Sequence, residues 1–399
     1  MKTNKTANAA VCMLFSAVMF AGCGKAASPA ETTPAADTEA PAETTVAEET
    51  AAAPSEFDGM STLDFTKGMK LGWNLGNTLD ATGKGMSSET SWGQPTTTKE
   101  MIDFVKESGF TTIRIPVSWS NHTDADYNID EAWMNRVNEV VDYAIDDGMF
   151  VIINAHHDCD AYYPTEEKYE ESSKYLKTIW TQIADRFKDY DEHLIFESMN
   201  EPRLKDTSKE WWFQQNDPEG IASIKTIVKL NKDFVEVIRN SGGNNPKRFL
   251  MLPSHAASPD NALNDAFEMP DDPANRLIVS VHAYTPYDFA MNKNGYSDWD
   301  GSHEGDITWF MNGLDDKFIK NGYGVVIGEF GSTNKDNLEA RVAWSDNYTR
   351  LAAEHGIPCI LWDNGGINVG EENFGMIDRK NLKVFFPEIL DAMTKNYNK

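Results

Sequence analysis

The feature that most constrains the fold is an alternation of short apolar runs with amphipathic stretches between residues 57 and 399. Eight of these runs have the length and composition of β-strands. Some, such as 151–153 and 325–327, are apolar throughout, which is typical of parallel strands buried on both faces. The eight candidate strands are 69–73, 112–116, 150–154, 194–198, 248–252, 277–282, 325–330 and 359–362.

Amphipathic stretches separate these runs. Residues 131–147 and 223–240 repeat apolar side chains at the spacing of one helix face. Eight strand–helix units predict an α/β protein of the (β/α)8 TIM barrel class. The alternative, a doubly wound open sheet, would need a glycine-rich phosphate turn after the first strand. Residues 72–77 read Gly-Trp-Asn-Leu-Gly-Asn, which is not that turn, so we predict the barrel.

The first 22 residues are typical of a secretory signal peptide. Two lysines precede a mostly apolar run over 7–22, which is shorter than a comfortable membrane span. The residues that end at Cys23 read Phe-Ala-Gly-Cys and resemble a bacterial lipobox, in which cleavage precedes a cysteine that then receives a lipid. We therefore expect a lipoprotein-type signal peptide over 1–22 and lipidation at Cys23, with plain secretion as the alternative.

A second N-terminal segment, 23–56, is rich in Ala, Thr, Pro and Glu. Residues 26–56 contain seven acidic side chains and no basic or aromatic one. Such a composition cannot bury enough apolar surface to offset the entropy of ordering. We predict a disordered linker over 23–56 that tethers a folded domain over 57–399. The expected location is extracellular, either anchored at the cell surface through Cys23 or secreted.

The charge balance excludes one class of partner. The chain has 36 Lys and Arg against 63 Asp and Glu, a net charge of -27, which repels nucleic acids and anionic lipids. We expect no nucleic-acid partner, and contact with a membrane only through the N-terminal lipid.

The four cysteines are too few for a disulfide framework, and we do not expect Cys159 and Cys359 to pair. The default oligomeric state is a monomer.

The carboxyl ends of the predicted strands are unusually polar, and in a barrel they share one rim. Glu201 follows the fourth strand and Glu329 lies at the end of the seventh, so we expect them to face each other across the barrel mouth. Two such carboxyls suit cleavage of an acetal, because one can protonate the departing oxygen while the other attacks or activates water. The other candidate site residues are Trp73, Asn74, Arg114, His156, His157, Asn200, His282, Tyr284 and Trp362.

Two other interpretations compete with this one. Residues 156–160 read His-His-Asp-Cys-Asp, which raises a metal-dependent barrel hydrolase. Adjacent ligands diverge, however, and the His-x-His usual after the first strand of such enzymes is missing, so we expect no metal and no cofactor. A catalytically silent polysaccharide-binding lipoprotein is less favoured, because both Glu201 and Glu329 are present.

Three motifs resemble the retaining glycoside hydrolases of family 5, which are clan A (β/α)8 barrels. They are Asn-Glu-Pro at 200–202, His-Ala-Tyr at 282–284 and Ile-Gly-Glu-Phe at 327–330. Further runs are similar to the bacterial endo-β-1,4-glucanase (cellulase) branch, which includes xyloglucanases. These runs lie at 72–80, 114–119 and 154–158, and the similarity extends over 71–362.

The resemblance implies a role for each candidate. Glu201 would be the general acid/base with a raised pKa, and Glu329 the ionised nucleophile. Arg114 would hold Glu329 by bidentate hydrogen bonds, Tyr284 would donate to it, and Asn200 would bind the substrate 2-hydroxyl. His156, His157 and His282 would position the substrate and carboxyls, Trp362 would stack on the sugar, and Asn74 and Trp73 would bind substrate or support the site.

The implied activity is a retaining endo-β-1,4-glucanase that acts on cellulose-type and related plant cell-wall glucans through a covalent glycosyl-enzyme. Xyloglucan, mixed-linkage glucan and mannan are the alternative substrates.

Other residues are expected to have structural roles. Glu197 is the buried partner of Arg114, and Trp309 lies in a helical stretch of the core. Trp133, Trp180 and Trp344 are assigned to the core as well, whereas Trp73, Trp92, Trp119, Trp211, Trp212 and Trp299 are candidates to line a long cleft, of which we expect only some to do so.

Overall fold

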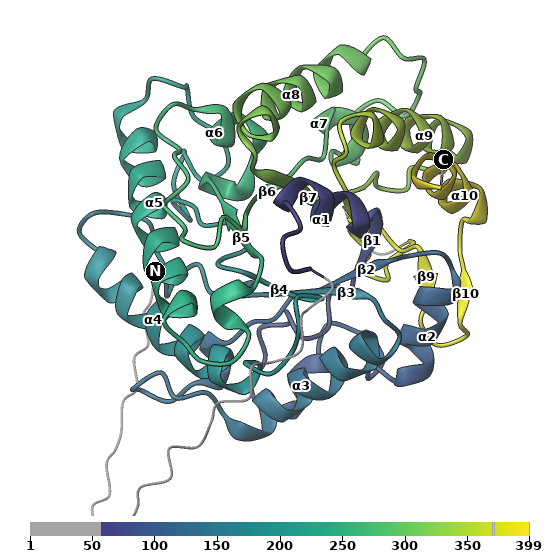
Figure 1. Cartoon of the computed structure of the whole chain (residues 1–399). Helices are drawn as coiled ribbons and strands as arrows, with labels where there is room; N and C mark the ends of the chain where they lie inside the picture. The colour runs from purple at the N-terminus through teal and green to yellow at the C-terminus, as the bar shows by residue number, and fades with distance from the viewer. Residues whose placement is uncertain (1–56, 369, 371, 399) are drawn as a thin grey trace, which may run out of the picture. The chain divides into compact units, whose positions relative to one another are not determined.

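The computed structural model describes residues 57–368, 370 and 372–398. Its eight parallel strands close into a barrel in chain order (Figure 1). They are β1 (Leu71–Asn74), β2 (Thr112–Ile115), β3 (Phe150–Asn154), β4 (Leu194–Glu197), β5 (Leu250–Pro253), β6 (Leu277–His282), β7 (Gly324–Phe330) and β8 (Cys359–Leu361). The predicted (β/α)8 class is confirmed, and all eight strands begin and end close to their predicted positions.

The strand register brings polar residues of neighbouring strands side by side. Asn74 of β1 pairs with Arg114 of β2. Asn154 of β3 pairs with Glu197 of β4, and His282 of β6 pairs with Glu329 of β7. Barrel closure through the pairing of β1 with β8 completes one ring of such residues at the carboxyl ends of the strands.

Helices surround the barrel (Figure 1). They are α2 (Lys99–Glu107), α3 (Glu131–Asp146), α4 (Tyr169–Arg186), α5 (Pro218–Arg239), α6 (Pro259–Leu263), α7 (Tyr287–Ala290), α8 (Glu304–Lys317), α9 (Leu338–Glu354) and α10 (Pro387–Tyr397). The shorter elements are the 3-10 turns Met86–Thr90, Ser120–His122, Asn245–Lys247, His255–Ala257 and Ile319–Asn321, and the hairpin of β9 (Ile377–Asp378) and β10 (Lys383–Val384).

Local chemistry explains where the long helices begin. α5 starts five residues before the predicted 223–240 stretch, because Asp217 accepts hydrogen bonds from the backbone N–H groups of Glu219 and Gly220, and Pro218 follows it. Asp130 caps α3 in the same way through Ala132 and Trp133. Each cap satisfies N–H groups that have no partner within the helix.

The barrel interior near its amino-terminal end is apolar. Helix α1 (Thr62–Met69) contributes Phe65 and Met69 to a cluster with inward-facing residues of the strands. The strand members are Ile152, Ile195, Met251, Ile278, Val326 and Ile360. This cluster fills one end of the barrel, so polar groups can gather only at the other.

Three of the four tryptophans assigned to the core, those at 133, 180 and 344, are buried. The prediction is wrong for Trp309, which is 55% exposed. The buried stripe of α8 consists of Ile307, Phe310, Met311 and Leu314, and Trp309 lies off that stripe. Trp119 was a candidate for the cleft, but it is fully buried and donates its indole N–H to the backbone oxygen of Asn154 at 2.8 Å.

Several predictions concern the N-terminus. The signal peptide over 1–22, the linker over 23–56 and lipidation at Cys23 all lie outside the described residues. Among the helices that the structure describes, none combines the length and apolar content needed to cross a bilayer. Cys159 and Cys359 are both buried free thiols, as expected.

Candidate active site

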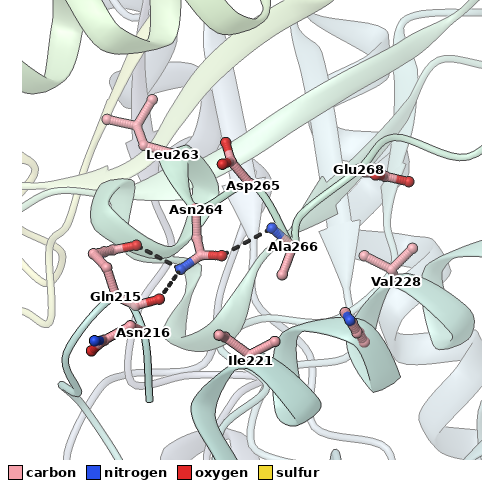
Figure 2. A pocket seen from close by; sticks show the side chains of 10 residues that line it. Gln215, Asn216, Ile221, Val228, Leu263, Asn264, Asp265, Ala266 and Glu268 are labelled. Atoms are coloured by element: carbon pink, nitrogen blue, oxygen red, sulfur yellow. Dashed lines mark hydrogen bonds between the residues drawn. The ribbon is translucent and has the colours of Figure 1, made fainter. Parts of the chain in front are cut away.

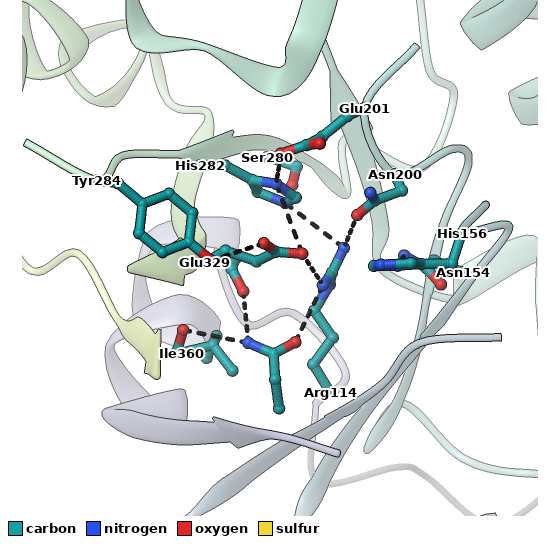
Figure 3. Close-up of polar contacts among 12 residues, drawn as sticks. Arg114, Asn154, His156, Asn200, Glu201, Ser280, His282, Tyr284, Glu329 and Ile360 are labelled. Atoms are coloured by element: carbon teal, nitrogen blue, oxygen red, sulfur yellow. Dashed lines mark hydrogen bonds and ion pairs between the residues drawn. The ribbon is translucent and has the colours of Figure 1, made fainter. Parts of the chain in front are cut away.

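Glu201 and Glu329 lie in one polar cluster at the carboxyl ends of the strands (Figure 3). Glu329 belongs to β7, and Glu201 follows β4 by four residues. One carboxylate oxygen of each, together with a ring nitrogen of His282, lie within 4.8 Å of one another. The Glu201 side chain is 17% exposed and the Glu329 side chain is 7% exposed, so both carboxyls are largely shielded from solvent. This spacing allows one sugar carbon and its bridging oxygen to be addressed by the two groups together.

Glu329 is held on both of its oxygens. Arg114 Nη1 donates to Oε1 at 2.8 Å, and the Tyr284 hydroxyl donates to Oε2 at 2.9 Å. The contact with Arg114 is therefore single and not the expected bidentate pair. Burial and the charge of Glu329 raise the pKa of Tyr284 well above its usual value, so its hydroxyl stays protonated and can donate. Both hydrogen bonds favour the ionised form of Glu329.

The remaining donors of Arg114 explain why its contact with Glu329 is single. Nε donates to Glu197 at 2.8 Å and Nη2 donates to Asn200 Oδ1 at 2.6 Å. Nη1 is shared with Asn74 Oδ1 at 2.9 Å. Burial works to lower the pKa of Arg114, but the Glu197 and Glu329 carboxylates outweigh it and keep the guanidinium charged. The predicted pair of Arg114 with Glu197 is confirmed, at 2.8 Å.

Glu201 is held by His282, whose Nδ1 lies 2.8 Å from Oε1. The other ring nitrogen of His282 lies 3.4 Å from Arg114 Nη2, and an arginine N–H can only donate. In its neutral form His282 therefore accepts at Nε2 and carries its proton on Nδ1, which donates to Glu201. Asn200 offers its oxygen to Arg114, so its amide N–H groups remain as donors for a ligand.

The two carboxyls differ in their electrostatic surroundings. Burial raises the pKa of Glu329, and the charge of Glu201 adds to this. Burial also works to raise the pKa of Glu201, but the hydrogen bond from His282 and the charges of Arg203 and Arg114 outweigh it, so the pKa of Glu201 is lowered. This differs from the raised pKa that we expected for Glu201, because the sequence did not show the cations around that carboxyl.

Of the aromatic and histidine candidates, His156, His157 and Trp362 pack against one another, whereas Trp73 is buried below them. His156 is buried and stacks parallel to Trp362, with ring centroids 5.9 Å apart. His157 is one-third exposed, and its ring meets that of His156 edge to face at 4.4 Å. Trp73 is fully buried, with its N–H bonded to Asp363 at 2.8 Å, so it supports the site from below and offers no face to a sugar.

Asn74 is also a supporting residue. It is fully buried, and its amide donates to the backbone oxygen of Gly328 at 2.9 Å while its oxygen accepts from Arg114. Asn74 thus ties β1 to β7 and holds Arg114 in place beneath Glu329.

Within the part of the chain that the structure describes, two groups of side chains have the composition of a metal site, but neither fits one. In the group of Glu201, His282 and Glu329, the Arg114 guanidinium already pairs with Glu329 at 2.8 Å, and His282 Nδ1 carries the proton that it donates to Glu201. In the group of Asp80, His156 and His157, Asn154 Nδ2 lies 3.1 Å from His156 Nδ1 and donates to it. This leaves the proton of His156 on Nε2, where it is a donor and not a ligand.

Sequence reasoning missed three residues of this cluster. Ser280 donates to Glu197 Oε1 at 2.5 Å, and Asn154 Nδ2 lies 2.9 Å from Glu197 Oε2. Arg203 lies 3.9 Å from Glu201 Oε2. Ser280 and Asn154 lie on inward-facing positions of their strands, which alternation along the predicted strands would have revealed. Arg203 follows Glu201 by two residues, and a cation so close to a strand-end carboxyl was the available signal.

A hollow of about 760 Å³ lies elsewhere, between α5 and residues 263–268 (Figure 2). Its apolar side includes Ile221 and Val228. Asn264 donates to both oxygens of Gln215, at 2.9 and 2.6 Å, so polar groups there satisfy one another. Three charged side chains, Lys225, Asp265 and Glu268, also line this hollow. The carboxyl pair that is hydrogen-bonded to an arginine and a histidine lies at the Glu201–Glu329 cluster, so we place the chemistry there.

Comparison with known proteins agrees with the geometry. The family described as Cellulase (glycosyl hydrolase family 5) matches residues 79–368. Endoglucanase B of Ruminococcus albus is 46% identical over 340 residues, which cover 84% of this chain and 80% of that protein. The cellulase/esterase CelE of Acetivibrio thermocellus is 46% identical over 341 residues, which cover 84% of this chain but only 40% of that longer protein.

A solved structure is also similar to most of this chain. It is a mutant of the glycoside hydrolase family 5 lichenase from Caldicellulosiruptor sp. F32 in complex with cellotetraose. The two chains superpose with a TM-score of 0.82 at 47% sequence identity, over 84% of this chain and 95% of that one.

Proposed function

The chain belongs to glycosyl hydrolase family 5, and from this premise we propose that it is a retaining endo-β-1,4-glucanase acting on cellulose-type and related glucans. The observation that carries the proposal is the pair of carboxyls, whose oxygens approach within 4.8 Å. Retaining glycosidases have carboxyls about 5 to 5.5 Å apart, whereas inverting enzymes leave about 6.5 to 9.5 Å for a water molecule. The spacing here supports direct attack by one carboxylate.

In the first step, Glu329 attacks the anomeric carbon and forms an ester while the glycosidic C–O bond breaks. The departing oxygen takes the proton of Glu201. Arg114 and Tyr284 support Glu329 as the nucleophile, because both donate to its oxygens and favour its ionised form. The step requires Glu201 to be protonated and Glu329 to be ionised when substrate is bound. In the free site the pKa of Glu329 is raised and that of Glu201 is lowered, so substrate binding has to reverse this order.

In the second step, Glu201 takes a proton from water, the resulting hydroxide attacks the anomeric carbon, and the ester to Glu329 breaks. Ester formation removes the negative charge of Glu329. Since that charge disfavours ionisation of its neighbour, the pKa of Glu201 falls once the ester exists. The same residue is thus an acid in the first step and a base in the second.

Four neighbours suit sugar binding. The free amide N–H groups of Asn200 can bind the 2-hydroxyl next to the reacting carbon, where the hydrogen bond strengthens as positive charge develops. The Nε2 proton of His156 is a second donor. Trp362, which is 8% exposed and stacks on His156, would contact the sugar ring with the part of its indole that remains open. His157, which is partly exposed, would contact the substrate further along the chain.

Mixed-linkage glucan is the favoured alternative substrate, because the similar structure described above is a lichenase. Xyloglucan and mannan follow. The residues around Glu201 and Glu329 recognise a sugar at the cleaved bond, and side chains further out select the polymer.

The test is turnover of purified residues 57–399 on carboxymethyl cellulose, mixed-linkage β-glucan, xyloglucan and β-mannan, with the anomeric configuration of fresh products followed by NMR. We expect the highest kcat/KM on an unbranched glucan, internal cleavage and initial β-configured ends. Initial α-configured ends would show inversion and refute the double-displacement mechanism. A Glu201→Gln variant is the matched control for contaminating activity.

We also propose that the protein is exported and held at the cell surface by a lipid on Cys23. The support is the lipobox-like run that ends at Cys23 after an apolar stretch. The test is incorporation of an alkyne-labelled fatty acid into the full chain in a bacterial host. Label in the wild type but not in Cys23→Ala is expected, and equal label in both would refute the proposal.

The proposed assembly state is a monomer, because the residues of the candidate site all come from one chain. Light scattering during size-exclusion chromatography of residues 57–399 should give the mass of one chain at micromolar concentration. The mass of a dimer would contradict this.

A further inference from the structure

Arg203 connects parts of the structure that lie on different loops. Its side chain is only 13% exposed. Nη1 donates to the backbone oxygen of Glu201 at 3.0 Å and approaches the Cys159 thiol at 3.1 Å. Nε donates to Glu210 at 3.0 Å. The guanidinium therefore ties the segment after β4, which carries Glu201, to the loop after β3 and to the loop that leads to α5.

The guanidinium also stacks on an aromatic ring. Its central carbon lies 4.2 Å from the centre of the Trp211 ring, a distance typical of a cation–π contact. Trp211 is nevertheless 54% exposed, and the neighbouring Trp212 is 66% exposed. One side of the Trp211 indole thus rests on Arg203, while much of the ring remains open to a ligand.

Arg203 faces a particular oxygen of Glu201. His282 occupies Oε1, whereas Oε2 lies 3.9 Å from Arg203 Nη1. Oε2 is therefore the oxygen left free to carry the proton to a leaving group. The position of Arg203 places a permanent positive charge beside that oxygen, and this charge contributes to the lowered pKa of Glu201.

We propose that Arg203 is a positioning residue that orients the Glu201 carboxyl and couples it to the exposed Trp211 on the leaving-group side of the cleaved bond. The inference rests on the proposed function, in which Glu201 is the acid that protonates the leaving sugar. A glucan chain that stacks on Trp211 contacts the ring that packs against the Arg203 guanidinium, and the same guanidinium holds Glu201. Binding of the leaving sugar and delivery of the proton are therefore linked.

The first test compares two substrates with Arg203→Met. An unactivated cello-oligosaccharide needs the proton of Glu201, whereas an aryl cellobioside with a dinitrophenolate leaving group does not. We expect kcat/KM on the oligosaccharide to fall by about 10- to 100-fold, a fraction of the range that general acid catalysis supplies, with less than about 3-fold loss on the aryl substrate.

The second readout is the pH profile of kcat/KM on the oligosaccharide. Loss of the positive charge raises the pKa of Glu201, so Glu201 stays protonated to higher pH. The alkaline limb of the profile should therefore move to higher pH. Arg203→Lys keeps the charge but loses the fork of donors, so it should lose rate with a smaller shift of that limb. A merely structural role would leave the limb in place.

Lys205→Met is the matched control. Lys205 lies two residues further on the same segment, and its ammonium pairs with Asp160 at 2.6 Å and not with Glu201. This variant loses the same charge from the same loop and should keep both the wild-type rate and the wild-type pH profile.

The coupling to Trp211 has its own test. If the two residues act as a unit, the losses in Arg203→Met and Trp211→Ala will not multiply in the double variant. Losses that multiply would remove the coupling from the proposal.

Equal losses on both substrates together with an unmoved alkaline limb would overturn the proposal as a whole. Failure of the proposed function is distinguishable, because wild-type enzyme would then turn over neither substrate. Retained turnover of the aryl substrate shows that the variant is folded.

Discussion

Two layers of the same barrel interior differ completely in chemistry. The lower layer, nearer the amino-terminal end of the barrel, contains Ile152, Ile195 and Ile278. The upper layer lies two residues further along the same strands, where the inward positions are Asn154, Glu197 and Ser280. The step between the layers is about 7 Å, because a parallel strand rises about 3.3 Å per residue. Over that distance the barrel changes from a core that stabilises the fold to a cluster of compensated charges that suits catalysis.

The comparison shows how the barrel accommodates buried charge. Arg114 and Glu197 are both fully buried, which is costly unless every donor and acceptor is paired. Asn74, Asn200, Asn154 and Ser280 supply the remaining hydrogen bonds. The apolar lower layer stabilises the fold, and this stability offsets the cost of burying the charges of the upper layer.

The largest expected effect is in the upper layer. Glu329→Ala should reduce kcat by more than about 10⁴-fold, since removing a covalent nucleophile costs at least this much in well-studied enzymes. Rates on soluble β-glucan and an unfolding curve give the two readouts. Retention of even one-hundredth of wild-type kcat would show that Glu329 is not the nucleophile.

The matching change in the lower layer should act on stability alone. Ile195→Ala should lower the free energy of unfolding by about 2 to 5 kcal/mol, because it leaves a cavity in the apolar cluster. Denaturant titration measures this loss, and kcat per folded molecule should stay near that of wild type. A large drop in kcat without loss of stability would contradict the division between the layers.

A smaller effect concerns pH and a histidine outside both layers. Burial lowers the pKa of His122 to about 4, below the ordinary value of about 6.5 that it has in the unfolded chain. As pH falls below about 6.5 the unfolded chain takes up a proton that the folded protein refuses, so stability decreases. From pH 7 to 5 this group should cost about 2 kcal/mol.

The measurement is the free energy of unfolding at both pH values in wild type and His122→Gln. The variant should lose less stability than wild type over this interval. Identical pH dependence would show that His122 is not a neutral buried group.

The smallest effect separates support from sugar binding. Trp73→Phe removes the hydrogen bond to Asp363 and should cost about 1 kcal/mol of stability. Because Trp73 offers no face to a ligand, kcat/KM should change by less than about 3-fold. If instead the variant kept its stability and bound substrate at least about 10-fold more weakly, Trp73 would be a sugar platform after all.

Much of this architecture was predictable from the sequence, because parallel strands buried on both faces leave apolar runs that are read directly. The polar strand ends followed from the same pattern, since a barrel brings them to one rim. Burial of individual side chains was less accessible. Trp119 and Trp309 were misjudged because their exposure depends on neighbours that are far away in the sequence.

The electrostatics of Glu201 could not be predicted either. Its pKa depends on His282 and Arg114, which come from other strands, and on a side-chain conformation of Arg203 that no pattern reveals. Contacts over such sequence distances are set by the closed barrel and not by local spacing.

The most direct test of the central claim is to trap the sugar on the enzyme. A 2-deoxy-2-fluoro cellobioside with a dinitrophenolate leaving group forms the ester quickly and releases it slowly. Peptide mass spectrometry of the labelled protein should then find one added fluorocellobiosyl group, on Glu329. Label on another residue would contradict the account, as would continued turnover without any label.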